Sequence, residues 1–428
     1  MNFHKPLSKL KLLVLGANPE TVPLIQTAQK MGTYVIVTDN NPVAYAKQFA
    51  DKKVDIDGMD VPGLVTLARE EKVDGVIVGV ADRLITPYQQ ICEILELPCY
   101  ATREQCRVLT DKLIFNQKCK EHDISTIPSF DLPQNPTEKD LEKLVYPVFV
   151  KPVDANSGKG MSICYKKEEV IHSIDNAIKH SITKRYLIER CMNTDDMFVY
   201  FTIKDGATWV SATADRFTSR EQSGLSRVCL GNSYPSKHTE LYFSTVHDQF
   251  VKLFSSLKLR NCIFMTAAFV ENDTLHFYDP GFRLQGEAPD ILIESINGFD
   301  QKAMLIRFAL TGRMGQANLA KLNDCRFQGR HAATVWLLAK EGTIGQIEGL
   351  EEITSYHEVI KIAQRLYPGD KVSSMMVGTE AQVIARIYIA GSTKEQVKKA
   401  IKLVQKKTKV YDIKGKPMLL NGFDPDII

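Results

Sequence analysis

The sequence predicts an α/β protein, α+β overall, in which a parallel sheet comes first and antiparallel sheets follow. Through the first hundred residues, short β-branched runs alternate with segments of helical spacing, as in a parallel sheet with crossover helices. After Ser129 the pattern changes, and residues 197–213 and 261–279 alternate apolar and polar side chains as antiparallel strands do. The change coincides with three chain-breaking prolines, Pro133, Pro136 and Pro147.

The individual elements follow from the same periodicities. In the N-terminal part we expect strands at 10–16, 34–38 and 74–78 and helices at 23–31 and 85–95. Residues 103–122 then form two short helices, the second opened by Asp111 and Lys112. A hairpin at 145–165 and a strand at 185–188 come next. The remaining segments are predicted as helices at 301–310, 356–366 and 393–408 and strands at 332–338 and 381–389.

Composition narrows the class of protein. At 428 residues the chain is too long for one core and should divide into about two to four domains. Its net charge of +3 is too small for this length to indicate binding to nucleic acid or to a membrane surface. No stretch reaches the length of a membrane-spanning helix, and residues 1–5 lack an apolar signal core. Nine scattered cysteines without a Cys-x-x-Cys pair indicate reduced thiols, so we expect a cytoplasmic protein.

The turn after the first strand argues against a dinucleotide cofactor. Gly16 stands where a dinucleotide-binding fingerprint would begin, but Asn18 and Thr21 occupy the positions of its two further glycines. Asp39 could hold a ribose hydroxyl, but we favour its role as a cap of residues 40–44. An NAD-dependent enzyme is therefore disfavoured.

Two lysines and a glycine-rich loop point instead to a nucleoside triphosphate. Lys151 ends the apolar segment 146–150, and a charge in such a place needs an anionic partner. Lys112 precedes it, and the small residues of 156–161 let backbone N–H groups close over phosphates. The loop is not a Walker motif, because Lys159 is followed by Gly160 where a Ser or Thr is required.

The order of these motifs along the chain resembles a known family. Asp111-Lys112 is followed by Phe149-Val150-Lys151-Pro152 and Ser157-Gly158-Lys159-Gly160, then by Leu187-Ile188-Glu189-Arg190 and finally by Asp279-Pro280-Gly281-Phe282-Arg283. This order is similar to that of the ATP-grasp superfamily, the ligases that include biotin carboxylase, carbamoyl phosphate synthetase, glycinamide ribonucleotide synthetase and L-amino acid ligases. The glycine-rich segment is closest in style to that of the formate-dependent purine transformylase. The resemblance covers roughly residues 10–330.

The resemblance implies three domains. Residues 1–105 would form a Rossmann-like parallel domain that precedes the ATP-grasp fold. Residues 106–328 would form the ATP-grasp fold in two subdomains, the smaller at about 125–190. Residues 329–428 resemble, more loosely, the α+β domain that closes the same enzymes.

The resemblance also implies an ATP site. Lys112 and Lys151 match the family lysines that bind the α- and β-phosphates, although Lys112 also suits an ordinary helix surface. The loop over the phosphates would consist of Asn156, Ser157, Gly158, Lys159, Gly160 and Met161, residues that are equally common in hairpin turns. Glu189 and Met192 match the hinge whose backbone reads adenine, with Ile188 packed on the ring. Asp196 falls near the acid that binds ribose.

The implied metal site departs from the family pattern. Asp279 fits the second of two acidic positions that hold magnesium, but the asparagine expected two residues later is Gly281. Counting back through the turn at 271–274 puts Thr266 or Ala267 at the first acidic position, and neither has a carboxylate. Glu271 and Glu287 are weak candidates to replace it. Arg283 matches the family arginine that binds a substrate carboxylate or the γ-phosphoryl group.

The resemblance therefore predicts an ATP-dependent ligase that joins a small-molecule carboxylate to an amine or ammonia through an acyl phosphate. ATP and Mg²⁺, or Mn²⁺, are the expected cofactors, with no nucleic acid or membrane partner and with a homodimer as the expected assembly. The thinned metal site supports one alternative, an ATP-binding protein that has lost turnover. Neither a biotin attachment motif nor a glutaminase-type Cys-His arrangement is evident.

Overall fold

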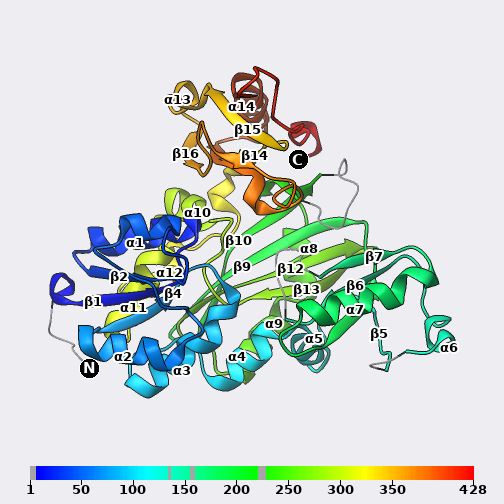
Figure 1. Cartoon of the computed structure of the whole chain (residues 1–428), viewed down its shortest axis with the longest axis horizontal. Coiled ribbons are helices and arrows are strands. Elements are labelled where there is room, and N and C mark those ends of the chain that lie inside the picture. The colour runs from blue at the N-terminus through cyan, green and yellow to red at the C-terminus, as the bar shows by residue number, and fades with distance from the viewer. Residues whose placement is uncertain (1–5, 134–135, 155–159, 220–227) are drawn as a thin grey trace.

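The computed structural model describes residues 6–133, 136–154, 160–219 and 228–428. Within these ranges the strands form a four-stranded parallel sheet, a second four-stranded sheet, an eight-stranded sheet and a three-stranded sheet. Figure 1 shows three lobes: the N-terminal sheet with its helices, the region around β6 and α7, and the C-terminal part above both.

The N-terminal lobe is the predicted parallel sheet, in the order β3-β2-β1-β4. Its strands are β1 (Lys11–Leu15), β2 (Tyr34–Thr38), β3 (Lys52–Val54) and β4 (Gly75–Val78). The helices around it are α1 (Val22–Lys30), α2 (Val61–Glu71), α3 (Ile85–Leu95) and, from much later in the chain, α11 (Gln301–Thr311). Gly75 permits the approach of α11, since a Cβ there would lie 2.3 Å from the carbonyl oxygen of Ala309.

Side chains close the turns that the sequence singles out. The Asp39 carboxylate accepts hydrogen bonds from the backbone N–H of Ala17 at 3.1 Å and of Asn41 at 2.9 Å. It therefore ties the turn after β1 to the turn after β2. Asp111 separates α4 (Arg103–Thr110) from α5 (Lys112–Lys120), and its carboxylate accepts from two N–H groups in the first turn of α5. The prediction that Asp111 and Lys112 open this helix is confirmed.

The second four-stranded sheet carries the predicted hairpin. Its order is β5-β8-β6-β7, with β5 (Ser129–Phe130), β6 (Val148–Pro152), β7 (Ser162–Cys164) and β8 (Tyr186–Arg190). The helix α7 (Val170–His180) packs on it through a core that includes Val148, Val150 and Ile174.

The eight-stranded sheet runs through the centre of the molecule in the order β13-β12-β9-β10-β11-β14-β18-β16. Its strands are β9 (Asp195–Lys204), β10 (Ala207–Thr218), β11 (Cys229–Tyr234), β12 (Cys262–Glu271), β13 (Thr274–Gly281), β14 (His331–Leu338), β16 (Val359–Gln364) and β18 (Val383–Gly391). Because β11 pairs with β14, strands of the C-terminal hundred residues extend the central sheet.

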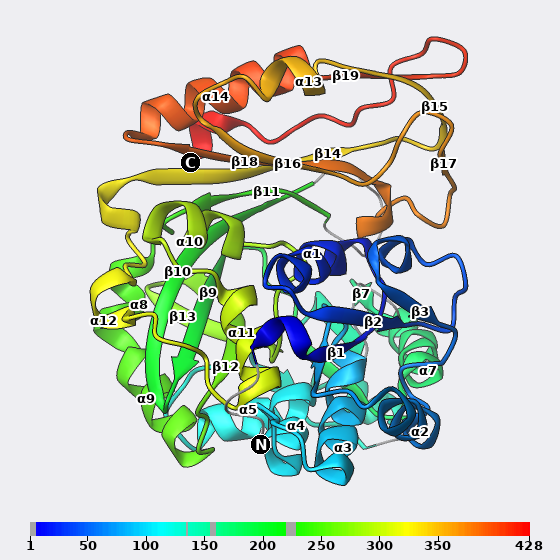
Figure 2. The same cartoon turned by 90° about the vertical axis from the view of Figure 1, so that its left-hand side faces the viewer.

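The helix predicted at 356–366 is wrong, since β16 occupies Val359–Gln364 as an edge strand paired with β18. Apolar residues at Tyr356, Ile360 and Ala363 fit helical spacing as well as a strand does, and the pairing with β18 decides between them. Figure 2 shows α14 (Lys394–Lys407) lying over β14 and β18.

The remaining elements complete the lobes. The three-stranded sheet contains β15 (Gly342–Glu348), β17 (Lys371–Val372) and β19 (Lys409–Asp412). The other α-helices are α6 (Glu138–Leu141), α8 (Thr239–Thr245), α9 (His247–Ser256), α10 (Asp290–Asn297), α12 (Leu319–Leu322) and α13 (Leu350–Ile353). Short 3₁₀ helices lie at Leu7–Lys9, Pro19–Thr21, Tyr45–Phe49, Asp82–Leu84, Lys167–Glu169, Phe327–Gly329, Glu380–Gln382 and Pro425–Ile427.

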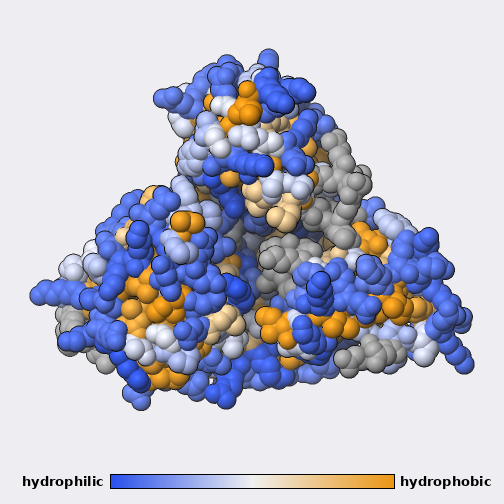
Figure 3. Space-filling model, viewed as in Figure 1, coloured by the Kyte–Doolittle hydropathy of each residue, from blue (hydrophilic) through white to orange (hydrophobic). Residues whose placement is uncertain are grey.

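A hollow opens where the three lobes meet (Figure 3). The face in this view is largely hydrophilic, with scattered apolar side chains. Of the helices that the structure describes, none is long and apolar enough to cross a lipid bilayer.

Candidate functional site

A single cavity of about 860 Å³ brings most of the predicted site residues together. It is lined by segments from all three lobes, including the turn after β1, α5, β6, β8 and the strands of the central sheet. The predicted site residues along it are Lys112, Lys151, Met161, Glu189, Met192, Asp196, Asp279 and Arg283.

The other predicted residues lie elsewhere. Ile188 is 1% exposed and belongs to the core between the second sheet and α7, so its side chain does not line the cavity. Gly160 lies in the turn before β7, where its φ of +72° suits glycine and where a Cβ would lie 2.7 Å from Cβ of His180. The predictions for Asn156, Ser157, Gly158 and Lys159 fall outside the described residues.

Lys151 has a buried acidic partner. Its Nζ lies 2.5 Å from Oε2 of Glu189, and the two side chains are only 4% and 1% exposed. Asn116 donates from Nδ2 to the same carboxylate at 3.4 Å. The register of β6 with β8 places the two residues on neighbouring strands, because Phe149 pairs with Glu189 and Lys151 with Leu187. The anion that the sequence requires for Lys151 is thus present in the protein itself.

Some backbone N–H groups of the hinge segment already donate hydrogen bonds within the protein. The N–H of Arg190 donates to the carbonyl of Pro128 at 2.9 Å, and that of Cys191 donates to Pro147 at 3.0 Å. Both β5 and β6 flank β8, so its edges are paired as far as Arg190. Met192, which follows and lines the cavity, marks where this chain segment faces the open space.

Lys112 and Asp279 form a second ion pair at the cavity wall. Lys112 Nζ lies 3.3 Å from Oδ1 of Asp279, and the aspartate side chain is 38% exposed. Lys112 comes from the first turn of α5 and Asp279 from β13, so the pair joins two elements far apart in the sequence. Such a partly solvated pair can open toward a ligand at modest cost.

The strand register explains why the predicted metal site has so few ligands. Ala267 pairs with Asp279, and Ala267 is completely buried, so the first acidic position holds a methyl group. A Cβ at Gly281 would lie 3.0 Å from Nε2 of Gln285 and from Cγ of Met265, so a side chain there needs both neighbours to shift. Among the residues that the structure describes, no group of three His, Cys, Asp or Glu side chains is placed to hold a metal ion.

Neither alternative acid joins Asp279 as a ready ligand. Glu271 is paired with Arg190 at 2.5 Å at the far end of the β12–β13 hairpin. Glu287 does line the cavity, where its carboxylate accepts from Tyr200 Oη at 3.3 Å and from Asn232 Nδ2 at 3.2 Å. Burial raises the pKa of Glu287 above its ordinary value, opposed by the charge of Arg216.

Arg283 connects the cavity to the N-terminal lobe. Its Nη2 pairs with Asp82, at the 3₁₀ turn after β4, and its Nη1 donates to the carbonyl of Leu284 at 2.8 Å. Sequence reasoning did not find Asp82 as its partner. A second link is Glu20, whose Oε1 lies 3.0 Å from Nη1 of Arg365 in the C-terminal part.

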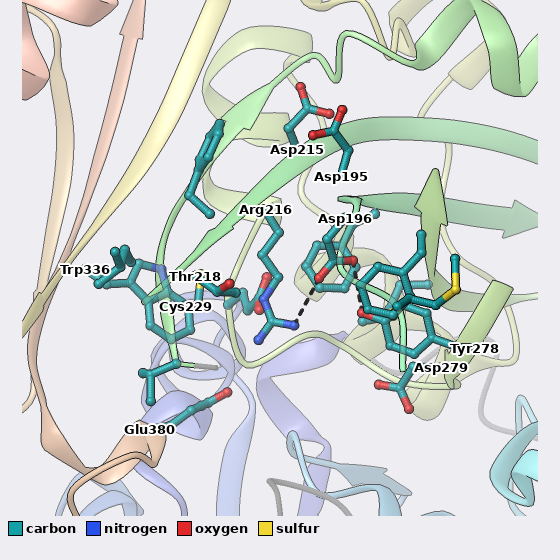
Figure 4. A pocket seen from close by; sticks show the side chains of 18 of the residues that line it. Asp195, Asp196, Asp215, Arg216, Thr218, Cys229, Tyr278, Asp279, Trp336 and Glu380 are labelled. Atoms are coloured by element: carbon teal, nitrogen blue, oxygen red, sulfur yellow. Dashed lines mark hydrogen bonds and ion pairs between the residues drawn. The ribbon is translucent and has the colours of Figure 1, made fainter. Parts of the chain in front are cut away.

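Asp196 lies among charged and aromatic side chains of the central sheet (Figure 4). Its Oδ1 accepts from Tyr278 Oη at 3.0 Å, and its Oδ2 lies 3.5 Å from Nη1 of Arg216. Burial raises the pKa of Asp196 to about 6, although Arg216 and the Tyr278 hydrogen bond act in the opposite direction. Sequence reasoning missed Arg216, which belongs to no motif of the resemblance and faces Asp196 only because β10 pairs with β9.

We expect the charge of Asp196 to make stability depend on pH. Its pKa of about 6 exceeds the value of about 4 for an unfolded chain, so its contribution is present below about pH 4 and is lost as the pH rises through 6. One pKa unit corresponds to about 1.4 kcal/mol. The difference in unfolding free energy between wild type and Asp196→Asn should therefore change by about 3 kcal/mol between pH 4 and pH 7. Urea unfolding at both pH values measures it, and an equal difference at the two would refute the shift.

Comparison with known proteins places the chain in a class. The family model described as "Carbamoyl-phosphate synthase L chain, ATP binding domain" matches residues 111–207. Formate-dependent phosphoribosylglycinamide formyltransferase of Prochlorococcus marinus is 28% identical over 199 residues, which are 45% of this chain and 50% of the relative. D-alanine–D-alanine ligase B of Clostridium tetani is 29% identical over 119 residues, 26% of this chain and 33% of the relative. The chain thus spans about half or less of the curated relatives it matches.

Solved structures resemble it over nearly the whole length. Phosphoribosylglycinamide synthetase from Anaerococcus prevotii has a TM-score of 0.72 at 17% identity, and the match covers 94% of this chain and 99% of the other. L-amino acid ligase from Bacillus licheniformis has a TM-score of 0.76 at 14% identity with the same coverages. The biotin carboxylase domain of Hydrogenobacter thermophilus 2-oxoglutarate carboxylase, solved with MgADP and bicarbonate, has a TM-score of 0.74 at 15% identity over 95% of this chain and 91% of the other.

These similarities confirm the predicted fold class and the predicted resemblance to ATP-grasp ligases. Residues 111–207 match a model of an ATP-binding domain, and the mixed α/β architecture of the chain is shared with the solved structures of phosphoribosylglycinamide synthetase and L-amino acid ligase. A family model of an ATP-binding domain covers Lys112, Lys151 and the hinge, and one neighbour holds MgADP.

Proposed function

We propose that this protein is an ATP-dependent ligase that joins a small-molecule carboxylate to an amine or ammonia and releases ADP and phosphate. The observation that carries the proposal is the convergence of Lys112, Lys151, Asp279 and Arg283 on one cavity. These residues come from α5, β6, β13 and the segment after β13, so the fold itself brings the four together. Two ammonium groups, a guanidinium and a carboxylate in one cleft suit a phosphoryl-transfer site.

The proposed reaction has two steps. A carboxylate oxygen of the substrate bonds to the γ-phosphorus of ATP while the bond from that phosphorus to ADP breaks. The nitrogen of the amine then bonds to the acyl carbon, phosphate leaves with its bonding electron pair, and the nitrogen loses a proton. The protein's part is to hold the reacting groups and to stabilise the charge on the phosphates, which Lys112, Lys151 and Arg283 would do.

The fit of Mg²⁺, or of Mn²⁺, rests on few residues. Asp279 is the carboxylate that would hold the ion, while Ala267 and Gly281 offer no ligand. A bound Mg²⁺ neutralises phosphate charge, and it commonly keeps several water ligands, so a site with one carboxylate suits it. The two lysines then carry more of the binding of the phosphates.

A second candidate function is a nucleotide-binding protein without turnover, and the small number of metal ligands supports it. The fully buried methyl group of Ala267 opposite Asp279 is an observation that favours it. Both candidates require ATP binding, and they differ in whether ADP is formed when a carboxylate and an amine are supplied.

The test combines binding and turnover. MgATP should raise the melting temperature, since a ligand that binds only the folded state stabilises it, by about 2.7 kcal/mol at a hundred times its Kd. A panel of amino acids, small carboxylates and amines should then contain a pair that stimulates release of phosphate. If ATP stabilises the protein and no pair in the panel yields ADP, the candidate without turnover is favoured. If ATP has no effect on melting, both candidates fail.

The remaining partners are proposals of the same kind. A homodimer is proposed because the Hydrogenobacter thermophilus neighbour is a dimer. The nine cysteines are all free thiols, most of them buried, which supports a reducing compartment such as the cytoplasm.

A further inference from the structure

The cavity extends well beyond the residues that the ATP proposal uses. At the end formed by β10, β11, β14 and the C-terminal segment its walls are Phe217, Val228, Leu230, Trp336 and Phe423. In the central sheet, β9, β10 and β11 lie between β12, which pairs with the strand that carries Asp279, and β14, which carries Trp336. Strand spacing therefore puts β12 and β14 about 19 Å apart. We call this aromatic end the distal lobe.

Arg216 is the cation that projects into the cavity beside the distal lobe (Figure 4). Its side chain is 24% exposed, and the exposed part faces the cavity. The Asp196 carboxylate, 3.5 Å from Nη1, is its ion-pair partner, while Nε is buried without a hydrogen-bond partner among the described residues. A desolvated guanidinium with unused donor capacity favours an anion nearby.

Besides Asp196, three acidic side chains of the cavity lining are already engaged by other partners. Asp215 accepts from Ser236 Oγ at 2.6 Å and from the N–H of Lys237 at 2.9 Å. Glu380 lies 3.0 Å from Nη2 of Arg386, and Glu287 is bound by Tyr200 and Asn232. Asp196 and Glu287 are the acids whose negative charge acts on the guanidinium, so a doubly charged phosphate would be repelled more strongly than a singly charged carboxylate.

The side chains that form the walls of the distal lobe favour a ligand with an apolar portion. The rings of Phe217 and Phe423 are stacked at 5.0 Å with an interplanar angle of 2°. Trp336 packs beneath the guanidinium of Arg386 at 4.2 Å, and its indole Nε1 is a buried donor with no partner in the described ranges. Aromatic surfaces beside one cation bind a planar apolar group that carries one negative charge.

We propose that the distal lobe binds the carboxylic acid substrate, with its carboxylate on Arg216 and an apolar, aromatic-sized body against Phe217, Trp336 and Phe423. This inference rests on the proposed ligase function and names its substrate class. The placement suits the chemistry, because Asp196 joins Arg216 to Tyr278, the residue before Asp279. Arg283 is held in place by Asp82 and by the Leu284 carbonyl, and the proposed reaction assigns it to the γ-phosphoryl group.

The experiment uses the fluorescence of Trp336. The chain has 2 tryptophans, Trp209 and Trp336, so Trp209→Phe leaves a single reporter inside the distal lobe. The probes are 3-phenylpropionate, its neutral amide, and acetate. We expect 3-phenylpropionate to change the emission saturably, the amide to bind at least tenfold more weakly, and acetate to give no saturable change.

Variants of the charged residues test the assignment in the same Trp209→Phe background. Arg216→Gln should weaken the binding of 3-phenylpropionate at least tenfold. Because that change leaves Asp196 without its partner, Arg216→Gln/Asp196→Asn serves as a second variant in which no buried charge is stranded, and it should lose the probe equally. Lys237→Gln removes another cation of the cavity lining, one that pairs with Asp195 at 2.9 Å, and should alter affinity less than twofold.

The outcomes separate this inference from the ligase proposal. Equal affinity for the acid and its amide, unchanged affinity in both Arg216 variants, or no saturable change with 3-phenylpropionate would each overturn the inference, even if another carboxylate supports ADP formation. Arg216-dependent binding of the probe without ADP formation from any acid would uphold the subsite and count against the ligase. MgATP binding, measured by calorimetry on Arg216→Gln and Lys237→Gln, verifies that the nucleotide site is intact.

Discussion

Replacing Lys151 with methionine should weaken MgATP binding at least tenfold and should also destabilise the fold. A hydrogen bond to a charged group contributes about 1.5–3 kcal/mol, and about 1.4 kcal/mol corresponds to a tenfold change in Kd. The same change strands the carboxylate of Glu189, which is 1% exposed and 2.5 Å from the lysine. Removing one partner of a buried ion pair costs about 3–5 kcal/mol. Calorimetry and urea unfolding measure the two effects.

A double variant separates binding from folding. In Lys151→Met/Glu189→Gln neither buried charge remains, so the unfolding free energy should recover most of the loss. The affinity for MgATP should stay low, because the ammonium group is still missing. If affinity and stability recover together, Lys151 acts only through the fold, and its assignment to the phosphates is wrong.

Lys151 also illustrates how far the sequence reaches. A lysine at the end of an apolar strand predicts an anionic partner, and the structure supplies one in Glu189, while the predicted phosphate partner stays a prediction. The partner is Glu189, a residue that the sequence placed in the adenine hinge, because β6 and β8 are neighbours only after the sheet has formed. The need for a counter-ion is local chemistry, whereas its identity depends on strand pairing.

The register opposite Asp279 was predictable for a related reason. A two-residue turn joins β12 to β13, and its residues Asn272 and Asp273 have φ values of 49° and 58°, as tight hairpin turns require. Counting back through so short a turn leads to Thr266 or Ala267, and the structure pairs Ala267 with Asp279. When a short turn joins two strands, the residues that pair across them can be counted from the sequence.

The distal lobe was not predictable by this route. Its residues come from four separate segments, at Phe217, Leu230, Trp336 and Phe423, and none of them belongs to a recognisable motif. They meet because β11 pairs with β14, a connection across a hundred residues of sequence. Single-sequence periodicity contains no information on such pairing. The roles of the ATP residues, like the domain boundaries at 105 and 328, remain predictions.

Replacing Asp279 with asparagine should abolish Mg²⁺-dependent phosphate release and leave part of the nucleotide binding. Asparagine keeps the shape of the side chain but removes the one carboxylate at the predicted metal-binding positions of these strands, since Ala267 is buried and Gly281 has no side chain. Loss of an outer-shell partner alone reduces metal affinity about 10–100-fold, so loss of this ligand should cost at least as much. Lys112, relieved of a partner at 3.3 Å, should still attract the phosphates.

Phosphate release is measured against Mg²⁺ concentration, and MgATP and metal-free ATP binding are compared by calorimetry. Glu271→Gln is the matched control, because it makes the same acid-to-amide change on the same hairpin, where Glu271 pairs with Arg190. Its phosphate release should stay within twofold of wild type. If Asp279→Asn keeps its Mg²⁺ dependence while Glu287→Gln loses it, the metal is held by the buried acid of the cavity and not by β13. If both variants retain it, the ion is bound by phosphates and water alone, and the thin metal site is sufficient without a protein carboxylate.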